Sequence, residues 1–507
     1  MDPLAGDSLS TDSLATLLTW TTTHGIIISP SIRVVDHGPT GNIAVVSVLS
    51  EPILPSSTLV SIPKTAILSV RSCSIAERIP FVPYGHGATL ALSLGLYYEI
   101  LQPVPIAILW NVSNAFPGDE DGVEAYSWLT GTEVEKELKT DEGQYIIEEI
   151  RQYYITVVQP ILSNFIPSPS LVGFLYAYSL VSSRAFLVDA YHGLSMVPIA
   201  DAFNHAYENH VQLERLRRLP RVRVPPRMRA RPRSSPSASA LPPAHMAAGA
   251  DTVDMVTSRA VPPHAEVFNT YGRLGSAALL ARYGFALEGG EADGATFGWV
   301  GSGICGLRAE DGGVGGGADR EFARMYGTVR SACGERLSGL LSEDNAMVYV
   351  PGSADGRAGP CLCINAEAQV SMDLWLWAAV EALFVLQREG VLRLEGADEA
   401  AMLLETVIHL QNRIEGADKD HDVGDQHKAR RVLAALARTL SALCRSRVAR
   451  MGKRPALDTA QLGALLDNLP PDRPKTRLAV AHVLGERVLL ESCTAGCVHE
   501  FGKDLYI

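Results

Sequence analysis

Pro198-Ile-Ala-Asp-Ala-Phe-Asn-His205 and Glu266-Val-Phe-Asn-Thr-Tyr271-Gly272 are the two stretches that decide the fold of this sequence. The first offers an Asn-His pair, whose side chains both donate and accept hydrogen bonds. The second is predicted to be a strand that ends in a tyrosine. An Asn-His pair alone carries little information, so the order of the two stretches along the chain is what matters.

A short helix is predicted to follow the second stretch and to end at a second tyrosine, Tyr283. Ser276 can cap the start of this helix, and Gly284 can close its end. Leu279, Leu280 and Tyr283 form its apolar stripe. The helix therefore has both of its ends and its buried face marked in the sequence.

The whole set resembles the C-terminal half of a SET domain, the protein-lysine methyltransferase module. The features that match are Asp-x-x-Asn-His, a strand ending Tyr-Gly, and then Tyr-Gly-Phe. The resemblance extends to the group that contains plant Rubisco large-subunit methyltransferases and fungal ribosomal-protein lysine methyltransferases. It implies an α+β fold: a SET β fold with a helical insertion, followed by an all-helical C-terminal domain.

The apolar pattern along the chain divides it into segments that fit this order. Residues 13–74 are expected to form the N-terminal part of the SET domain, and 75–190 the helical insertion. Residues 191–300 are expected to form the C-terminal part, and 320–507 a helical domain. By resemblance, that last domain binds the substrate.

Three helices are predicted within the insertion, over residues 88–100, 145–161 and 170–186, because apolar residues recur there every three or four positions. In the C-terminal part, residues 251–256 are predicted to form a strand with Val253 and Met255 on one face.

The composition is that of a globular protein. Hydrophobic residues make up 47% and charged residues 20% of a chain of 507 residues, which is long enough for several domains. The longest apolar run, 372–386, contains Asp373 and Glu381, so a buried helix is predicted rather than a membrane span. The N-terminus has neither the basic head nor the apolar stretch of a secretory signal. We therefore expect a nuclear or cytoplasmic location, or both, and no secretion.

The formal net charge of −12 argues against general nucleic-acid binding and suits a basic protein partner. One segment has the opposite charge. Arginines recur from Arg215 to Arg233, and Ser-, Pro- and Ala-rich sequence continues to about residue 248, so 215–248 is expected to be disordered. Two interpretations stay open: an electrostatic arm for RNA or nuclear import, or a segment introduced by an error in the gene model.

The eight cysteines do not suggest a disulfide framework in a chain of this length. They cluster in Cys361-Leu-Cys363 and in Cys493-x3-Cys497-x-His499. The second cluster could be a metal clip, but a fourth ligand is not nearby in the sequence, so reduced buried thiols are favoured and no metal is expected.

The resemblance implies S-adenosylmethionine as the cofactor and assigns residues to it. Gly41, Asn42 and Ile43 correspond to a Gly-x-Gly turn whose main chain faces the cofactor in SET proteins, because glycine lets a backbone approach a ligand closely. Ile43 departs from that pattern, which puts the fit of the turn in question. Asn204 and His205 are expected to hold the cofactor, His205 largely through its backbone.

Arg184 is predicted to point inward, because it continues the apolar stripe of Ala177 and Val181 at a helix end. A buried arginine needs a charged or hydrogen-bonded partner. The resemblance makes that partner the carboxylate of the cofactor's methionine part. The alternative is an arginine that extends to solvent from the helix end.

Tyr271 is the candidate catalytic residue, because a phenol at the strand end can place its oxygen beside the transferring methyl group and orient the amine. The resemblance assigns Tyr283 to the wall of the lysine channel, and Asp201 to the neighbourhood of the substrate. For Tyr283 an ordinary place in the helix core is an equal alternative.

Three functions follow from these features. The first is a protein-lysine methyltransferase that acts on a basic protein, with a ribosomal protein as the leading substrate and a histone-like protein as another. The second is a catalytically inactive SET scaffold that binds proteins, which Ile43 and the 215–248 segment favour. The third is an RNA-associated factor that works through the arginines of 215–233.

Overall fold

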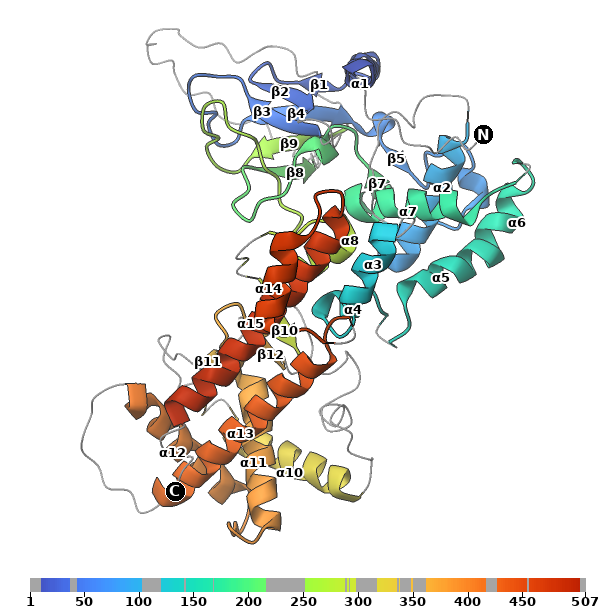
Figure 1. Ribbon diagram of the computed structural model, residues 1–507. Helices are drawn as coiled ribbons and strands as arrows, with labels where there is room; N and C mark the ends of the chain where they lie inside the picture. The colour runs from blue at the N-terminus through green and yellow to red at the C-terminus, as the bar shows by residue number, and fades with distance from the viewer. Residues whose placement is uncertain are drawn as a thin grey trace, which may run out of the picture. The chain divides into compact units, whose positions relative to one another are not determined.

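The computed structural model describes residues 11–36, 43–102, 120–140, 143–166, 168–215, 251–287, 290, 292–297, 317–334, 337, 348–349, 362–415, 426–453 and 456–501. The chain divides into two compact units (Figure 1). The first is built from residues 1–115 and 150–272, and the second from 116–149 and 273–507. The domain boundaries expected from the sequence stay a prediction. Within the expected insertion, residues 116–149 belong to the second compact unit.

Several expectations fall on residues outside these ranges. Gly41 and Asn42 are among them, and so is the segment 216–250, which contains nearly all of the arginine run and its Ser- and Pro-rich continuation.

The main sheet of the first unit joins strands from both ends of the expected SET domain. Its order is β1 (Ile27–Ile28), β4 (Thr58–Pro63), β9 (Thr252–Thr257) and β8 (Val211–Arg215), all antiparallel. Figure 1 shows β4 beside β9, although nearly two hundred positions separate them, and Val60 pairs with Met255. The strand predicted over 251–256 is confirmed, and Val253 and Met255 are both buried.

Two smaller sheets complete the β structure of this unit. One pairs β2 (Ile32–Asp36) with β3 (Ile43–Ser47). The other has the order β5 (Leu68–Ser69), β7 (Gly193–Met196) and β6 (Ala185–Asp189). β3 is the strand that begins at Ile43, so it starts where the predicted cofactor turn ends.

The helices predicted in the insertion are present. They are α2 (His86–Ile100), α5 (Ile146–Tyr153) continued by a π-helical turn (Tyr154–Val158) and α6 (Gln159–Leu162), and α7 (Leu171–Arg184). An earlier helix, α1 (Thr11–Thr23), begins the described chain. The last helix ends two residues earlier than expected, because Ala185 already begins β6.

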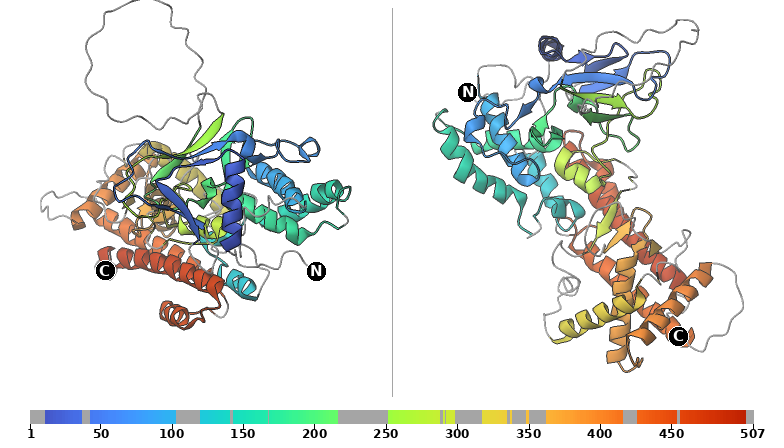
Figure 2. Two further views of the ribbon diagram at one scale, coloured as in Figure 1. Left: turned by 90° about the horizontal axis from the view of Figure 1, so that it is seen from above. Right: turned by 180° about the vertical axis from the view of Figure 1, so that it is seen from behind.

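Helices α2 and α7 pack closely, and Figure 2 shows them side by side. Their contact requires a glycine: a Cβ on Gly173 would lie 2.5 Å from Cε2 of Tyr97. The Tyr97 hydroxyl accepts the Ser170 N–H at 2.8 Å, and the Ser170 hydroxyl caps α7 by accepting the Gly173 N–H at 3.1 Å. The start of α7 is thus fixed against α2, and Arg184 lies at its other end.

The second unit is mainly helical, as expected. Its helices are α3 (Glu120–Trp128), α4 (Glu133–Glu137), α8 (Ser276–Tyr283), α10 (Gly317–Cys333), α11 (Met372–Arg388), α12 (Ala397–Glu415), α13 (Gln426–Arg450), α14 (Thr459–Asn468) and α15 (Pro474–Phe501). Leu374, Trp377, Val380 and Phe384 on α11 are all buried. Leu436 and Leu440 on α13 are also buried, so the apolar stripes read from the sequence form the core.

The unit also contains a sheet that the sequence analysis did not predict. It has the order β10 (Gly294–Thr296), β12 (Cys363–Asn365), β13 (Val370–Ser371) and β11 (Val348–Tyr349). The C-terminal region is therefore not entirely helical. Strands of two or three residues are too short to give a periodic signal. In addition, β10 pairs with β12 about seventy positions further along the chain.

A buried cluster of charges joins four elements of this unit. Arg447 on α13 donates from Nη2 to Glu133 Oε1 on α4 and to Glu486 Oε1 on α15, each at 2.9 Å. The Glu133 carboxylate also accepts the Thr296 N–H of β10 at 2.9 Å and the Lys136 ammonium at 3.0 Å. These charged hydrogen bonds satisfy groups that would be costly to bury alone.

The cluster shifts the pKa values of its members. Burial by itself raises the pKa of Glu486, but the charge of Arg447 and the contacts with His482 outweigh burial, so that the pKa falls to about 2. Burial lowers the pKa of Lys136 in spite of the attraction of Glu133. The stability of the unit should therefore depend on the charge state of this cluster.

Among the described residues, none of the helices combines the length and the apolar character needed to cross a membrane.

We predict that the change Arg447→Met destabilises the protein by roughly 3–5 kcal/mol at neutral pH, because it leaves two carboxylates buried without their shared cation. Urea unfolding followed by circular dichroism measures the loss. Arg282→Met is the control, since Arg282 pairs with Glu137 at 2.7 Å but its side chain is 53% exposed. The control should cost about 0–1 kcal/mol, and equal losses in the two variants would contradict the prediction.

Urea unfolding at lower pH tests how the stability of the protein depends on the protonation of Glu486. Glu486 takes up its proton near pH 4.5 in the unfolded chain and near 2 in the folded protein. Its contribution to stability is therefore complete above pH 4.5 and is lost as the pH falls toward 2.

Candidate functional site

The two stretches that decide the fold lie against each other in the first unit. The Asn269 N–H donates to the Asn204 carbonyl at 2.8 Å, and the Ala206 N–H donates to the Asn269 carbonyl at 3.1 Å. On its other side the second stretch contacts β3, where the Val267 N–H donates to the Val45 carbonyl at 2.8 Å. Residues 266–271 thus bridge β3 and the Asn-His stretch.

The strand expected over 266–271 does not form as a continuous element. Glu266 and Asn269 each make an isolated β-bridge, to Val46 and to His205 respectively. The segment alternates between two different neighbours, so neither side gives it a regular ladder. The sequence pattern indicated extended backbone, but it could not show that the segment would pair with two different neighbours.

The Asn204 side chain is held in one orientation. Its Nδ2 donates to Glu266 Oε1 at 2.7 Å and, at a longer 3.5 Å, to the carbonyl of Ile43. Glu266 begins the second stretch, and its position in the sequence predicted no role for it. The available signal was a charged residue directly before two apolar residues, Val267 and Phe268.

His205 and Tyr271 are in direct contact. The Tyr271 N–H donates to His205 Nδ1 at 3.2 Å, and the two rings stack with centroids 5.1 Å apart and an interplanar angle of 19°. Burial lowers the pKa of His205, although a backbone hydrogen bond with Asn269 opposes the shift. The phenol hydroxyl of Tyr271 lies 3.4 Å from the carbonyl of Phe203, to which it donates.

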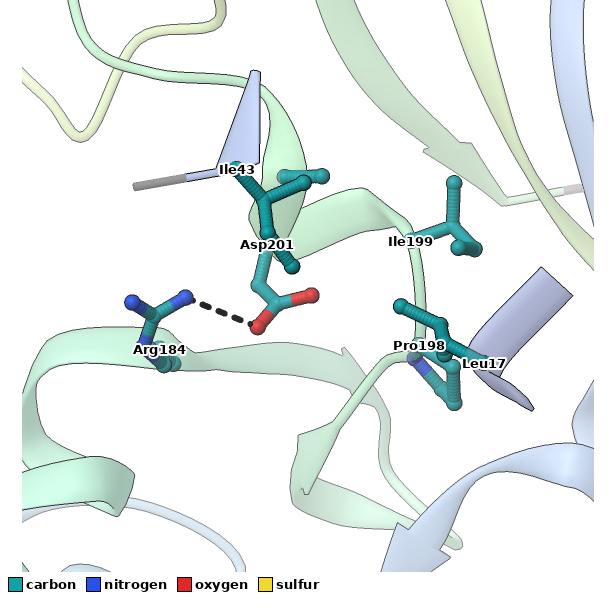
Figure 3. Close-up of a pocket in the computed structure, with 7 residues that line it drawn as sticks. Leu17, Ile43, Arg184, Pro198, Ile199 and Asp201 are labelled. Atoms are coloured by element: carbon teal, nitrogen blue, oxygen red, sulfur yellow. Dashed lines mark hydrogen bonds and ion pairs between the residues drawn. The ribbon is translucent and has the colours of Figure 1, made fainter. Parts of the chain in front are cut away.

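A small pocket lies next to this assembly, and Figure 3 shows the side chains around it. It is lined by Leu17, Ile43, Arg184, Pro198, Ile199, Asp201 and Ala202. Arg184 Nη1 and Asp201 Oδ2 form an ion pair at 3.1 Å across it (Figure 3). The pocket therefore combines an apolar wall with one cation and one anion.

The structure places Arg184 and Asp201 together, whereas the sequence analysis assigned one to the cofactor and the other to the substrate. Arg184 is the last residue of α7, and 26% of its side chain is exposed, so it is less deeply buried than the stripe of Ala177 and Val181 suggested. In the described structure Asp201 is the charged partner of Arg184. The spacing of residues in the sequence did not reveal this pairing.

Ile199 shows an unusual backbone at the pocket. It is buried and has φ 67°, a left-handed conformation that is rare for a β-branched residue. Such a conformation persists only where the surroundings enforce it, and it is concentrated at functional sites. The adjacent turn at Ala200–Ala202 carries Asp201 toward Arg184.

Tyr283 belongs to the second unit, as the last residue of α8. Gly284 closes that helix with φ 77°, as predicted. Ser276 is the first helical residue and not its cap. The Ser276 hydroxyl instead donates to the Leu287 carbonyl at 2.9 Å, and its N–H donates to Asp293. Burial raises the pKa of Tyr283, and the role of this tyrosine in a lysine channel stays a prediction.

The described cysteines of the second unit are buried. Cys363 lies on β12, and Cys493 and Cys497 lie on α15. Within the described ranges, His, Cys, Asp and Glu side chains do not gather in groups of three or more that could hold a metal ion. Cys361 and the side chain of His499 lie outside the described residues.

Comparison with known proteins gives matches in sequence and in structure. No protein-family model matches the chain. It is 25% identical over 309 residues to the N-lysine methyltransferase SETD6 of Rattus norvegicus, and 26% identical over 310 residues to that of Bos taurus. These matches cover 56% of this chain and 56% and 60% of the relatives, so the chain spans little more than half of their length.

Solved structures match over nearly the full chain. The SET domain of LSMT bound to methyllysine and AdoHcy has a TM-score of 0.59 at 16% identity, covering 98% of this chain and 94% of that one. Rubisco LSMT bound to AdoMet has a TM-score of 0.55 at 15% identity, with 98% of this chain and 94% of that one covered. The chain has the fold of these SET-domain structures.

The SET fold with a helical insertion and a helical C-terminal region, expected from the sequence, is thus confirmed. Within this fold, the predicted residues Ile43, Arg184, Asp201, Asn204, His205 and Tyr271 all lie in the first unit. The contacts described above link Ile43 to Asn204, Arg184 to Asp201, and His205 to Tyr271.

We predict that Asn204→Asp destabilises the SET protein by about 1–3 kcal/mol at pH 7, because an acceptor replaces the donor that faces Glu266. The double variant Asn204→Asp with Glu266→Gln restores a donor and an acceptor in exchanged positions. Urea unfolding of the wild type, both single variants and the double variant forms a double-mutant cycle. The double variant should recover part of the lost stability, and strictly additive losses would contradict the contact.

Proposed function

We propose that this SET protein transfers a methyl group from S-adenosylmethionine to a lysine side chain of a basic protein. The observation that carries the proposal is the joint placement of Asn204, His205 and Tyr271 by hydrogen bonds between two distant stretches. The similarity to SETD6, whose name is that of an N-lysine methyltransferase, points to the same class.

The charges that line the pocket of the first unit complement the amino-acid end of S-adenosylmethionine. That end carries one carboxylate and one ammonium group, and the pocket offers one cation and one anion, Arg184 and Asp201. We assign Arg184 to the carboxylate and Asp201 to the ammonium, so that each would exchange its present partner for a ligand group. Leu17, Pro198 and Ile199 supply apolar wall around them.

The remaining cofactor contacts come from the main chain and from Asn204. When bound, S-adenosylmethionine supplies a methyl group on a positively charged sulfur. Ile43, at the start of β3, lines the pocket, and the Asn204 amide, which is oriented by Glu266, donates to the carbonyl of Ile43. Gly41 and Asn42 are proposed to continue this contact, and His205 to contribute its backbone.

The site must also favour the neutral amine form of the substrate lysine. A lysine has a pKa of about 10.4 in water, and it attacks as the neutral amine. A narrow apolar channel lowers that pKa by desolvation and keeps competing water away. We propose that Tyr283 forms part of the channel wall and that the Tyr271 hydroxyl orients the amine, so that positioning supplies much of the rate.

Tyr271 is not required to take the proton. A free phenol has a pKa of about 10, so it is a poor proton acceptor at neutral pH. Loss of the proton to solvent through a chain of waters serves the same purpose. The role of Tyr271 is therefore orientation and stabilisation of charge beside the reacting atoms.

A basic substrate is supported by the net charge of −12, which attracts a protein of opposite charge. We propose a ribosomal protein first and a histone-like protein second. The helical region of 320–507 is proposed to hold that substrate, and the location to be the nucleus, the cytoplasm or both.

The proposal predicts that the purified chain, given labelled S-adenosylmethionine, labels a protein in an extract of ribosomal proteins or histones. Tyr271→Phe should lower the labelling rate about a hundredfold or more, because it removes the hydroxyl beside the reacting atoms. Tyr191→Phe is the matched control, since Tyr191 is a tyrosine of the same unit that is 61% exposed. Mass spectrometry of the labelled protein identifies the target lysine.

An inactive scaffold is the second candidate, and Ile43 favours it because a side chain lines the pocket where SET proteins have a glycine. Calorimetry with S-adenosylhomocysteine separates the two functions. Binding together with labelling supports the enzyme, whereas absence of both heat and label supports the scaffold.

A further inference from the structure

We propose that the side chain of His205 is a positioning residue for Tyr271, acting as a neutral imidazole with an unprotonated Nδ1. The inference rests on the proposed function and deepens it, because it gives the histidine ring a task separate from the cofactor contact of its backbone. The ring acts through Tyr271 and not on the reacting atoms.

Two independent contacts fix Tyr271 to the ring. The backbone N–H of Tyr271 donates to His205 Nδ1 at 3.2 Å, which fixes the main chain of the tyrosine. The stacked rings, with centroids 5.1 Å apart and 19° between their planes, fix the side-chain torsion. Because both the main chain and the ring of Tyr271 are held, its hydroxyl has little room to move. The hydroxyl lies 3.4 Å from the Phe203 carbonyl.

The ring of His205 is itself fixed. The residue is 6% exposed, and its backbone pairs with Asn269, which is 3% exposed. The ring of Tyr207 meets it edge-on, with centroids 5.4 Å apart and an interplanar angle of 78°. A residue so constrained can transmit a fixed geometry to its neighbour, whereas a mobile side chain could not.

The hydrogen bond defines the tautomer. Because Nδ1 accepts the Tyr271 N–H, the proton of the neutral ring is on Nε2. Burial favours this neutral form, since it lowers the pKa of His205. Protonation of Nδ1 would place two donors against each other and release the backbone of Tyr271.

Substitutions at one position can separate the two contacts. His205→Phe keeps an aromatic ring for stacking but has no acceptor. His205→Asn keeps an acceptor, because the Asn Oδ1 can occupy the place of Nδ1, but has no ring. His205→Ala keeps neither contact, and all three leave the backbone unchanged.

The first test measures kcat and KM separately for each variant in the labelling assay. Relative to wild type, kcat should fall roughly five- to tenfold for the Phe and Asn variants, and further for the Ala variant. The KM for S-adenosylmethionine should change less than threefold. An increase in KM with an unchanged kcat would overturn the proposal, because it would make the side chain a cofactor ligand.

The second test needs no methyl transfer, so it distinguishes failure of this inference from failure of the proposed function. The chain is labelled with 15N-tyrosine, and the Tyr271 amide signal is assigned by its loss in Tyr271→Phe. In His205→Phe the amide proton should move upfield as its hydrogen bond is lost, and in His205→Asn it should stay near the wild-type position. An unchanged signal in His205→Phe would overturn the inference even if the enzyme is active.

Discussion

The pairing of two short stretches, 203–206 and 266–271, is the constraint on which the rest of the site depends. Two backbone hydrogen bonds through Asn269 hold them in register, at 2.8 and 3.1 Å. That register brings the His205 ring onto Tyr271 and the Asn204 amide onto Glu266. A shift of one residue would turn each of these side chains to the opposite side.

In the second unit, buried charges hold together elements that are distant in the sequence. Its helices bury apolar stripes, but the short α4 and the strand β10 contribute little apolar surface to that core. Arg447 joins α4 to α13 and α15 through Glu133 and Glu486, and Thr296 adds β10. Separating these elements would leave buried charges without partners, so the cluster ties the helices to one another.

The sequence predicted the elements that have a periodic apolar pattern or that end at a characteristic turn residue. The helices of the insertion, the strand with Val253 and Met255, and the closure of α8 at Gly284 follow from spacing and turn chemistry. Asn204 and Tyr271 were proposed from an ordered set of motifs, and Arg184 from a helix stripe together with the resemblance; their roles stay predictions. The pairing of Arg184 with Asp201, the left-handed backbone of Ile199 and the short strands described in the second unit were not found, because none of them leaves a periodic pattern in the sequence.

Hydrogen–deuterium exchange with and without S-adenosylhomocysteine tests the central claim most directly, since the claim is that three separate segments form one ligand site. The account predicts that residues 43–47, 198–206 and 266–271 become protected together, at the same ligand concentration. Protection of one of these segments alone, or protection confined to the second unit, would contradict it.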